Sequence, residues 1–156
     1  MVVLVTGATD GLGRAVAASL ARSGATVLLH GRSEERLAAT LAEVPGARAY
    51  RADLASLAEV RRLAAEVLER EPRLDVLVSN AGIGATVPGG GARMESADGH
   101  ELRFAVNYLA GYVLSRELVP LLARSAPARI VHVASAGQAP VRRSESSRRR
   151  PRAVAS

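Results

Sequence analysis

The sequence of 156 residues contains no cysteine, no lysine and no tryptophan. Without cysteine the chain cannot form disulfides, use a thiolate nucleophile or build a zinc site on sulfur, which fits a reducing compartment. No apolar run approaches the ~20 residues that cross a bilayer, and the apolar stretch from Val2 to Val5 is too short for a secretory signal. The sequence therefore predicts a cytoplasmic protein without a membrane segment.

Charge is unevenly distributed along the chain. The net charge of +6 comes mostly from residues 141–156, which hold six arginines and one glutamate, so residues 1–140 carry only +1. The serine- and arginine-rich segment has too little apolar content to pack. We therefore expect one domain over residues 1–140 and a basic, disordered tail over residues 141–156. Association with nucleic acid through this tail is a minor alternative function, because clustered arginines can neutralise phosphates.

Short apolar runs alternate with helical periodicity along most of the sequence. Strands are expected at residues 2–6, 25–30, 48–52, 74–79 and 129–134. Between them, apolar residues at helical spacing predict a first helix with Leu12, Val16 and Leu20 on its buried face, and later helices capped by Ser33 and Ser56. Such alternation predicts an α/β fold, with a doubly wound parallel sheet of about five strands and helices on both faces.

The second half of the chain is less regular. Residues 80–97 are rich in glycine, which predicts a surface loop. Helical spacing resumes from Leu102 to Val113 and predicts a long helix that bends near Pro120, because proline removes a backbone hydrogen bond.

A glycine-rich segment, Thr6-Gly7-Ala8-Thr9-Asp10-Gly11-Leu12-Gly13, joins the expected first strand to the expected first helix. Its three glycines would permit a tight turn, a close approach of backbone to a pyrophosphate and close packing of helix on strand. The exposed N–H groups at the start of the helix would face the anion. The alternative is a tight strand-to-helix connection that binds no ligand.

The Thr-Gly-x-x-x-Gly-x-Gly spacing resembles that of the short-chain dehydrogenase/reductase family. Further landmarks follow in the order that this family has: Asp53 with Leu54, then Asn80, Ala81 and Gly82, then Asn107, and finally Ser135. The resemblance covers about residues 2–137. Over residues 98–107 it is most similar to the retinol dehydrogenase-like and protochlorophyllide reductase-like branches.

The resemblance implies a role for each of these positions. The glycine-rich segment, with Thr6, Gly7, Thr9, Asp10, Gly11, Leu12 and Gly13, would bind the cofactor together with Asp53, Leu54, Asn80, Ala81 and Gly82. Asn107 and Ser135 would belong to the catalytic tetrad. Each also has a structural alternative: Asp53 as a cap or turn residue, Asn80 as a turn former, Asn107 as a helix-face amide and Ser135 as a strand-end serine.

The end of the expected second strand bears on the choice of cofactor. An acid at this position in NAD-dependent folds accepts hydrogen bonds from the ribose 2′-hydroxyl and would repel a 2′-phosphate. Here the position is Gly31, and Arg32 follows with a guanidinium that can bind a phosphate. The sequence favours NADP, with NAD possible, although Arg32 could be a solvated turn residue and Asp10 adds an unfavourable charge.

The family's chemistry moves a hydride while a tyrosine transfers the proton. A phenol with a pKa near 10 needs a nearby positive charge to act near neutrality, and the family supplies a lysine one helical turn later. Neither residue follows Ser135, and the pair Tyr112 and Arg116 imitates the motif on the wrong helix. We therefore expect an oxidoreductase fragment that lacks the C-terminal strands and the Tyr-x-x-x-Lys motif and is inactive alone.

Other functions stay open at this point. A protein that binds dinucleotide without turnover, as a sensor or partner subunit, would also carry these landmarks, and a homo-oligomer is possible. A small-molecule carbonyl or alcohol would be a substrate only of the completed protein. The histidines His30, His100 and His132 show no metal-ligand spacing, so we expect core or surface roles and no metal site.

Overall fold

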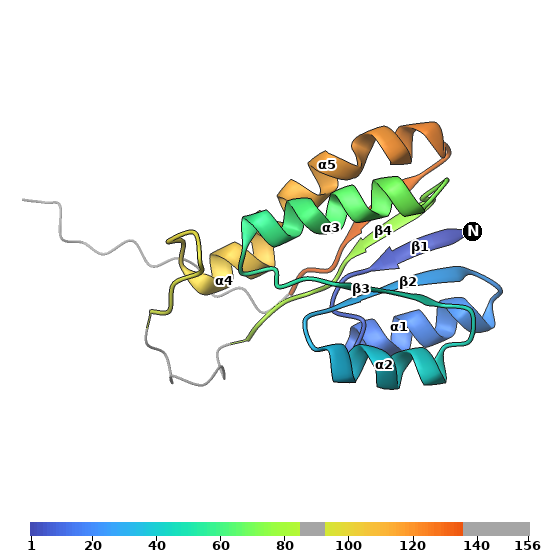
Figure 1. Cartoon of the computed structure of the whole chain (residues 1–156), viewed down its shortest axis with the longest axis horizontal. Helices are drawn as coiled ribbons and strands as arrows, with labels where there is room; N and C mark the ends of the chain where they lie inside the picture. Colours follow the sequence, from blue (N-terminus) through green and yellow to red (C-terminus); the bar gives the residue numbers. More distant parts are fainter. Residues whose placement is uncertain (85–92, 136–156) are drawn as a thin grey trace, which may run out of the picture.

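In the computed structural model, which describes residues 1–84 and 93–135, the strands form one parallel sheet in the order β3-β2-β1-β4-β5 (Figure 1). The strands are β1 (Val2–Val5), β2 (Thr26–Gly31), β3 (Arg48–Arg51), β4 (Val76–Ser79) and β5 (Arg129–His132). β1 pairs with both β2 and β4, so the order of the strands reverses beside it. This order is that of a Rossmann-like sheet and confirms the predicted α/β class.

Helices cover both faces of the sheet (Figure 1). They are α1 (Gly11–Arg22), α2 (Glu34–Glu43), α3 (Leu57–Arg70), the short α4 (Leu102–Phe104), the π-helix η1 (Ala105–Leu109) and α5 (Ala110–Arg124). α1 and α2 lie on one face, and α3 and α5 lie on the other. The sheet is therefore doubly wound, as predicted.

Alternate residues of β1 contribute to the two cores. Leu4 packs in the core beneath α3 and α5, whereas Val3 and Val5 pack in the core beneath α1 and α2. All three side chains are fully buried. Because the central strand has no exposed face, its short apolar run has the composition of a strand buried on both sides.

The predicted helix caps are present. Ser33 Oγ accepts a hydrogen bond from Arg36 N at 3.3 Å, and Ser56 Oγ accepts one from Glu59 N at 3.4 Å. Gly24 follows the end of α1 with φ +82°, a left-handed conformation that favours glycine.

The prediction for the buried face of the first helix is wrong at Leu12, whereas Leu20 is partly buried against the core. Leu12 is 58% exposed, and the fully buried residues of α1 are Gly13 and Ala17. A Cβ at Gly13 would lie 2.1 Å from the carbonyl oxygen of Gly7. Small residues therefore face the sheet because the helix begins in close contact with the turn before it, and Leu12 is left at the surface.

The long helix is irregular at a different place from the one predicted. α5 runs through Pro120 to Arg124, and the departure from α-helical geometry lies earlier, in η1, where Asn107 is located. π-helical turns of this kind frequently occur at functional sites. Predictions for residues 85–92 of the glycine-rich loop, and for the basic tail, fall outside the described residues and stay predictions. No helix within the described part of the chain is long and apolar enough to cross a membrane.

Candidate functional site

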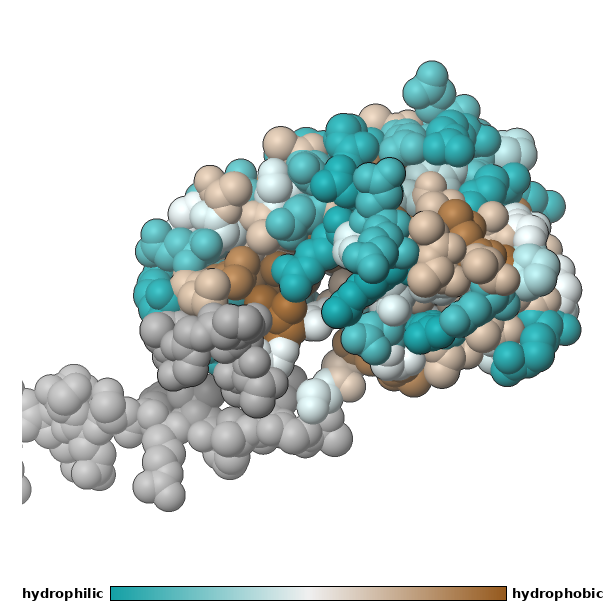
Figure 2. Space-filling model, turned by 60° about the horizontal axis from the view of Figure 1, so that its bottom comes forward, coloured by the Kyte–Doolittle hydropathy of each residue, from teal (hydrophilic) through white to brown (hydrophobic). Residues whose placement is uncertain are grey.

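A cleft of about 550 Å³ opens at the carboxyl ends of the strands. It is lined by residues from the turns after β1, β2, β3 and β4 and from the start of the long helix: Gly7, Thr9, Asp10, Gly11, Leu12, Gly13, His30, Gly31, Arg32, Ala52, Asp53, Leu54, Ala55, Asn80, Ala81, Gly82, Ile83, Leu102 and Val106. Figure 2 shows the surface hollowed near its centre, where hydrophobic atoms adjoin hydrophilic ones. Its volume and its place, where the strand order reverses, are typical of a ligand site in this fold.

The glycine-rich turn forms one wall of the cleft. Gly7 and Gly11 have φ values of +65° and +49°, which side chains other than glycine rarely adopt. Asp10 caps α1 by accepting a hydrogen bond from Gly11 N at 2.7 Å. The turn thus holds the N-terminus of α1 at the cleft, where the helix dipole favours an anion.

Several hydrogen bonds join the segment that follows β4 to this turn. Asn80 Nδ2 donates hydrogen bonds to the carbonyl oxygens of Thr6 and Gly7 at 2.9 and 3.3 Å. Thr6 Oγ1 accepts from the backbone N–H groups of Asn80 and Ala81, each at 3.0 Å. Thr6 is only 2% exposed and does not line the cleft, so it acts on the site through its neighbours.

Asn107 holds the next part of the same segment. Its Oδ1 accepts a hydrogen bond from Ile83 N at 2.8 Å, and its Nδ2 donates to Ile83 O at 3.1 Å. Asn107 itself does not line the cleft, whereas Ile83 does. The Asn107 side chain therefore links η1 to the segment that follows β4. The catalytic role of Asn107 stays a prediction.

Ser135 lies just beyond β5, at the same edge of the sheet. β5 is aligned with β4 by parallel pairing that continues past the strand, since Val133 N donates to Ser79 O at 2.9 Å. Ser135 is exposed and is not among the residues that line the cleft. Its catalytic role also stays a prediction.

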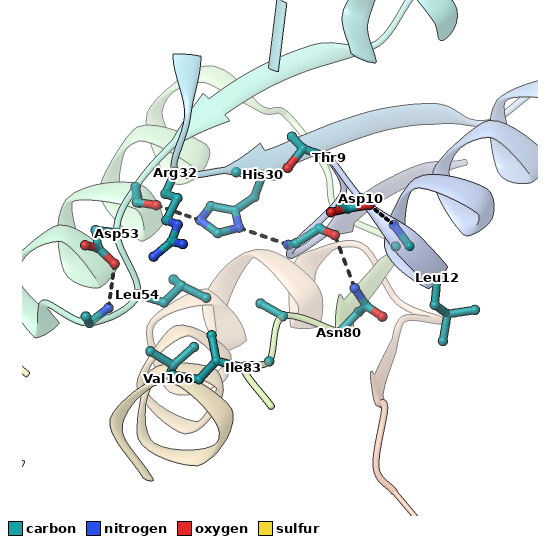
Figure 3. A pocket seen from close by; sticks show the side chains of 18 of the residues that line it. Thr9, Asp10, Leu12, His30, Arg32, Asp53, Leu54, Asn80, Ile83 and Val106 are labelled. Atoms are coloured by element: carbon teal, nitrogen blue, oxygen red, sulfur yellow. Dashed lines mark hydrogen bonds between the residues drawn. The ribbon is translucent and has the colours of Figure 1, made fainter. Parts of the chain in front are cut away.

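The end of β2 combines a glycine with an arginine. A Cβ at Gly31 would lie 2.6 Å from Cγ2 of Thr9, so any larger residue requires Thr9 to move. Arg32 follows at the rim of the cleft (Figure 3). Asp10, the unfavourable charge in the glycine-rich turn, forms an ion pair with Arg36 at 3.5 Å. Arg32 is thus the basic residue among the three charged residues that line the cleft, beside Asp10 and Asp53.

Asp53 is a turn residue that also lines the cleft. Its Oδ1 accepts a hydrogen bond from Ala55 N at 3.0 Å, and its own N–H donates to Glu59 Oε2 at 2.7 Å. Both bonds shape the turn between β3 and α3. Leu54 lines the cleft beside Asp53, and the contact of both residues with a cofactor stays a prediction.

One residue of the cleft was missed by the sequence analysis. His30 is 3% exposed and lies in β2, as expected of a core histidine, but its ring also lines the cleft (Figure 3). Its position just before Gly31, at the carboxyl end of a strand, could have indicated that His30 lies at the cleft. Burial lowers the pKa of His30 to about 4, against a smaller opposing effect of the Ala52 carbonyl, so the ring is neutral at physiological pH.

The remaining sequence candidates lie elsewhere. Tyr112 and Arg116 are exposed on α5 and do not line the cleft. Within residues 1–84 and 93–135, no group of three or more histidine, aspartate or glutamate side chains could hold a metal ion.

Comparison with known proteins agrees with this geometry. Residues 1–145 match the family described as short chain dehydrogenase. The chain is 43% identical to human retinol dehydrogenase 14, covering 85% of this chain and 44% of that protein. It is 37% identical to human retinol dehydrogenase 13, covering 85% of this chain and 40% of that protein. The chain thus spans less than half the length of these curated relatives.

Solved structures show the same fold. A metagenomic short-chain oxidoreductase in complex with NADP superposes with a TM-score of 0.76 and 33% identity, covering 90% of this chain and 65% of that one. The Pseudomonas aeruginosa RhlG/NADP active-site complex superposes with a TM-score of 0.70 and 35% identity, covering 83% of this chain and 52% of that one.

Proposed function

We propose that this chain, which belongs to the short-chain dehydrogenase family, binds NADP(H) in the cleft at the carboxyl edge of its sheet. The observation that carries the proposal is the junction of the glycine-rich turn with the N-terminus of α1, where left-handed glycines bring the backbone to the cleft. Pyrophosphate would lie at this turn, and Asp53 and Leu54 would lie beside the adenine ring.

The preference for NADP(H) over NAD(H) rests on the end of β2. Gly31 leaves no acid to repel a 2′-phosphate, and Arg32 supplies a guanidinium at the rim of the cleft. The two solved structures with NADP support the same choice. NAD(H) would still bind, more weakly, because the other contacts do not involve the 2′ position.

The whole protein would be an oxidoreductase that transfers hydride between NADP(H) and a carbonyl or alcohol. The names of the curated relatives, retinol dehydrogenases 14 and 13, support this substrate class. The 156 residues contain no lysine, and Tyr112 lies on α5 outside the cleft, so the polypeptide alone lacks the proton-transfer pair of the family. We therefore expect it to bind cofactor without turnover, as a dinucleotide-binding partner subunit also would.

Titration of NADPH, followed by its fluorescence, tests the proposal. Leu12→Glu places a negative charge at the pyrophosphate wall on a side chain that is already exposed, so it should weaken binding without unfolding the chain. The matched control is Val119→Glu, which adds the same charge to an exposed position of α5 outside the cleft. Absence of saturable binding by the unaltered chain, or equal loss in both variants, would contradict the proposal.

Turnover is tested separately. With NADPH and a panel of aldehydes and ketones, absorbance should show no oxidation above background. Turnover that disappears in Tyr112→Phe would overturn the expectation that the polypeptide alone is inactive and would assign the proton transfer to Tyr112.

A further inference from the structure

The imidazole of His30 joins two parts of the cleft that come from different turns. Gly7 N donates a hydrogen bond to His30 Nδ1 at 3.2 Å, and His30 Nε2 lies 3.2 Å from the carbonyl oxygen of Ala52 (Figure 3). A backbone N–H can only donate and a carbonyl can only accept, so a single neutral tautomer, with the proton on Nε2, satisfies both contacts.

The two partners of the ring lie at functionally distinct positions. Gly7 begins the glycine-rich turn, whereas Ala52 begins residues 52–55, the segment that includes Asp53 and Leu54. Backbone hydrogen bonds reinforce the junction, since Ala8 N donates to His30 O at 2.8 Å and Ala52 N donates to Gly31 O at 3.2 Å. The ends of β1, β2 and β3 therefore meet at His30.

We propose that His30 is a positioning residue that holds the pyrophosphate turn and the adenine segment at a fixed separation, ready for the dinucleotide. This inference rests on the proposed function of the cleft. A bridge present before binding reduces the ordering that the cofactor must impose, because the ring already joins the two walls.

The surroundings of the ring favour this role. His30 is almost completely buried, and desolvation keeps it uncharged, as its lowered pKa reflects. The charged groups that line the same cleft are Asp10, Arg32 and Asp53, of which Asp53 opposes the effect of burial on the ring. A neutral ring can hold both bonds, whereas a protonated ring would present a second donor to the N–H of Gly7.

The test compares His30→Gln with His30→Leu. The glutamine amide can accept from Gly7 and donate to Ala52, whereas leucine has similar bulk and can do neither. NADPH reports on both walls together, whereas adenosine 2′-monophosphate has no 5′-phosphate and reports on the adenine end alone. The control is Val67→Ala, which creates a cavity under α3 at a fully buried position outside the cleft. Circular dichroism defines a temperature at which all variants are folded.

At that temperature, His30→Leu should weaken NADPH binding about tenfold, the usual effect of losing one buried hydrogen bond. Adenosine 2′-monophosphate should lose less than about threefold in affinity, since it has no phosphate at the glycine-rich turn, and His30→Gln should bind NADPH within about threefold of the unaltered chain. Val67→Ala should bind both ligands unchanged. If His30→Leu does not fold, His30→Asn, whose shorter amide cannot reach both partners, should show the same selective loss of NADPH binding.

Two results would overturn the inference while leaving the proposed function intact. One is unchanged NADPH affinity in the leucine or asparagine variant, and the other is equal weakening of NADPH binding and adenosine 2′-monophosphate binding. Failure of the unaltered chain to bind NADPH would instead overturn the function of the cleft, and the inference with it.

Discussion

The methyl group of Thr9 lies against Gly31, so that a Cβ added at residue 31 would stand 2.6 Å from Thr9 Cγ2. This contact couples the glycine-rich turn to the end of β2. It gives a packing reason, beside the electrostatic one, for the absence of an acid at the position that would face the ribose of a bound dinucleotide.

The contact predicts that an acid at residue 31 is tolerated only after Thr9 is shortened. Gly31→Asp alone should lower the melting temperature because the new Cβ forces Thr9 to move. In a Thr9→Ala background the same change should fold and should shift the preference from NADPH toward NADH, because the carboxylate repels a 2′-phosphate. Equal melting temperatures for Gly31→Asp with and without Thr9→Ala would refute the packing explanation.

Asp10 should oppose binding of any anionic cofactor. Asp10→Asn keeps a good helix cap and removes one negative charge at the cleft, so NADPH should bind about two- to fivefold more tightly with little change in stability. Glu43→Gln is the control, because Glu43 is exposed, pairs with Arg14 on α1 and does not line this cleft. Calorimetric titration at low ionic strength measures the NADPH affinity of both variants. Equal tightening in both variants would mean that general charge, and not the position of Asp10, governs affinity.

The hydrogen bond from Ile83 N to Asn107 Oδ1 should protect the Ile83 amide from hydrogen exchange. Asn107→Ala removes the acceptor for Ile83 N, so hydrogen exchange at Ile83 should accelerate and the free energy of unfolding should fall by about 1 kcal/mol. Tyr108→Ala is a suitable comparison, since Tyr108 is exposed on the same π-helix. Identical exchange of the Ile83 amide in the Asn107 variant and the unaltered chain would contradict the assigned role.

His30 should also make stability depend on pH. Its folded pKa is about 4, below the ordinary value of 6.5, so the unfolded chain binds more protons between these limits. The contribution of His30 to the free energy of unfolding is complete above pH 6.5. It is lost as the pH falls toward 4, and the total loss is about 3 kcal/mol. Urea unfolding at pH 7 and pH 4.5 should show this loss, and His30→Gln should show a smaller one. A loss of the same size in His30→Gln would assign the effect to other groups.

Much of this site could be predicted from the sequence because its residues sit at strand ends. In a parallel sheet all carboxyl ends meet at one edge, so Gly7, Gly31, Asp53 and Asn80, far apart in the chain, could be expected to converge once the strands were placed. The cap residues were equally accessible, since Ser33 and Ser56 act within one turn of their own helix.

The features that escaped prediction depend on tertiary contacts. Helical spacing suggested that Leu12 is buried, but the close approach of Gly13 to Gly7 rotates Leu12 out to the cleft. Thr6 is buried and does not line the cleft, and it is hydrogen-bonded to the backbone of Asn80 and Ala81. The bridge through His30 requires two partners on different turns, which no local pattern encodes.

The most direct test of the account is the ratio of NADPH to NADH affinity in the unaltered chain and in Arg32→Ala, measured by calorimetry at one ionic strength. We predict that the unaltered chain binds NADPH at least about tenfold more tightly than NADH, as expected for a charge-assisted contact to the 2′-phosphate. Arg32→Ala should weaken NADPH binding and leave NADH binding unchanged, so that the ratio falls toward one. Equal affinity for the two cofactors in the unaltered chain, or a preference for NADPH that persists in Arg32→Ala, would contradict the assignment of this cleft.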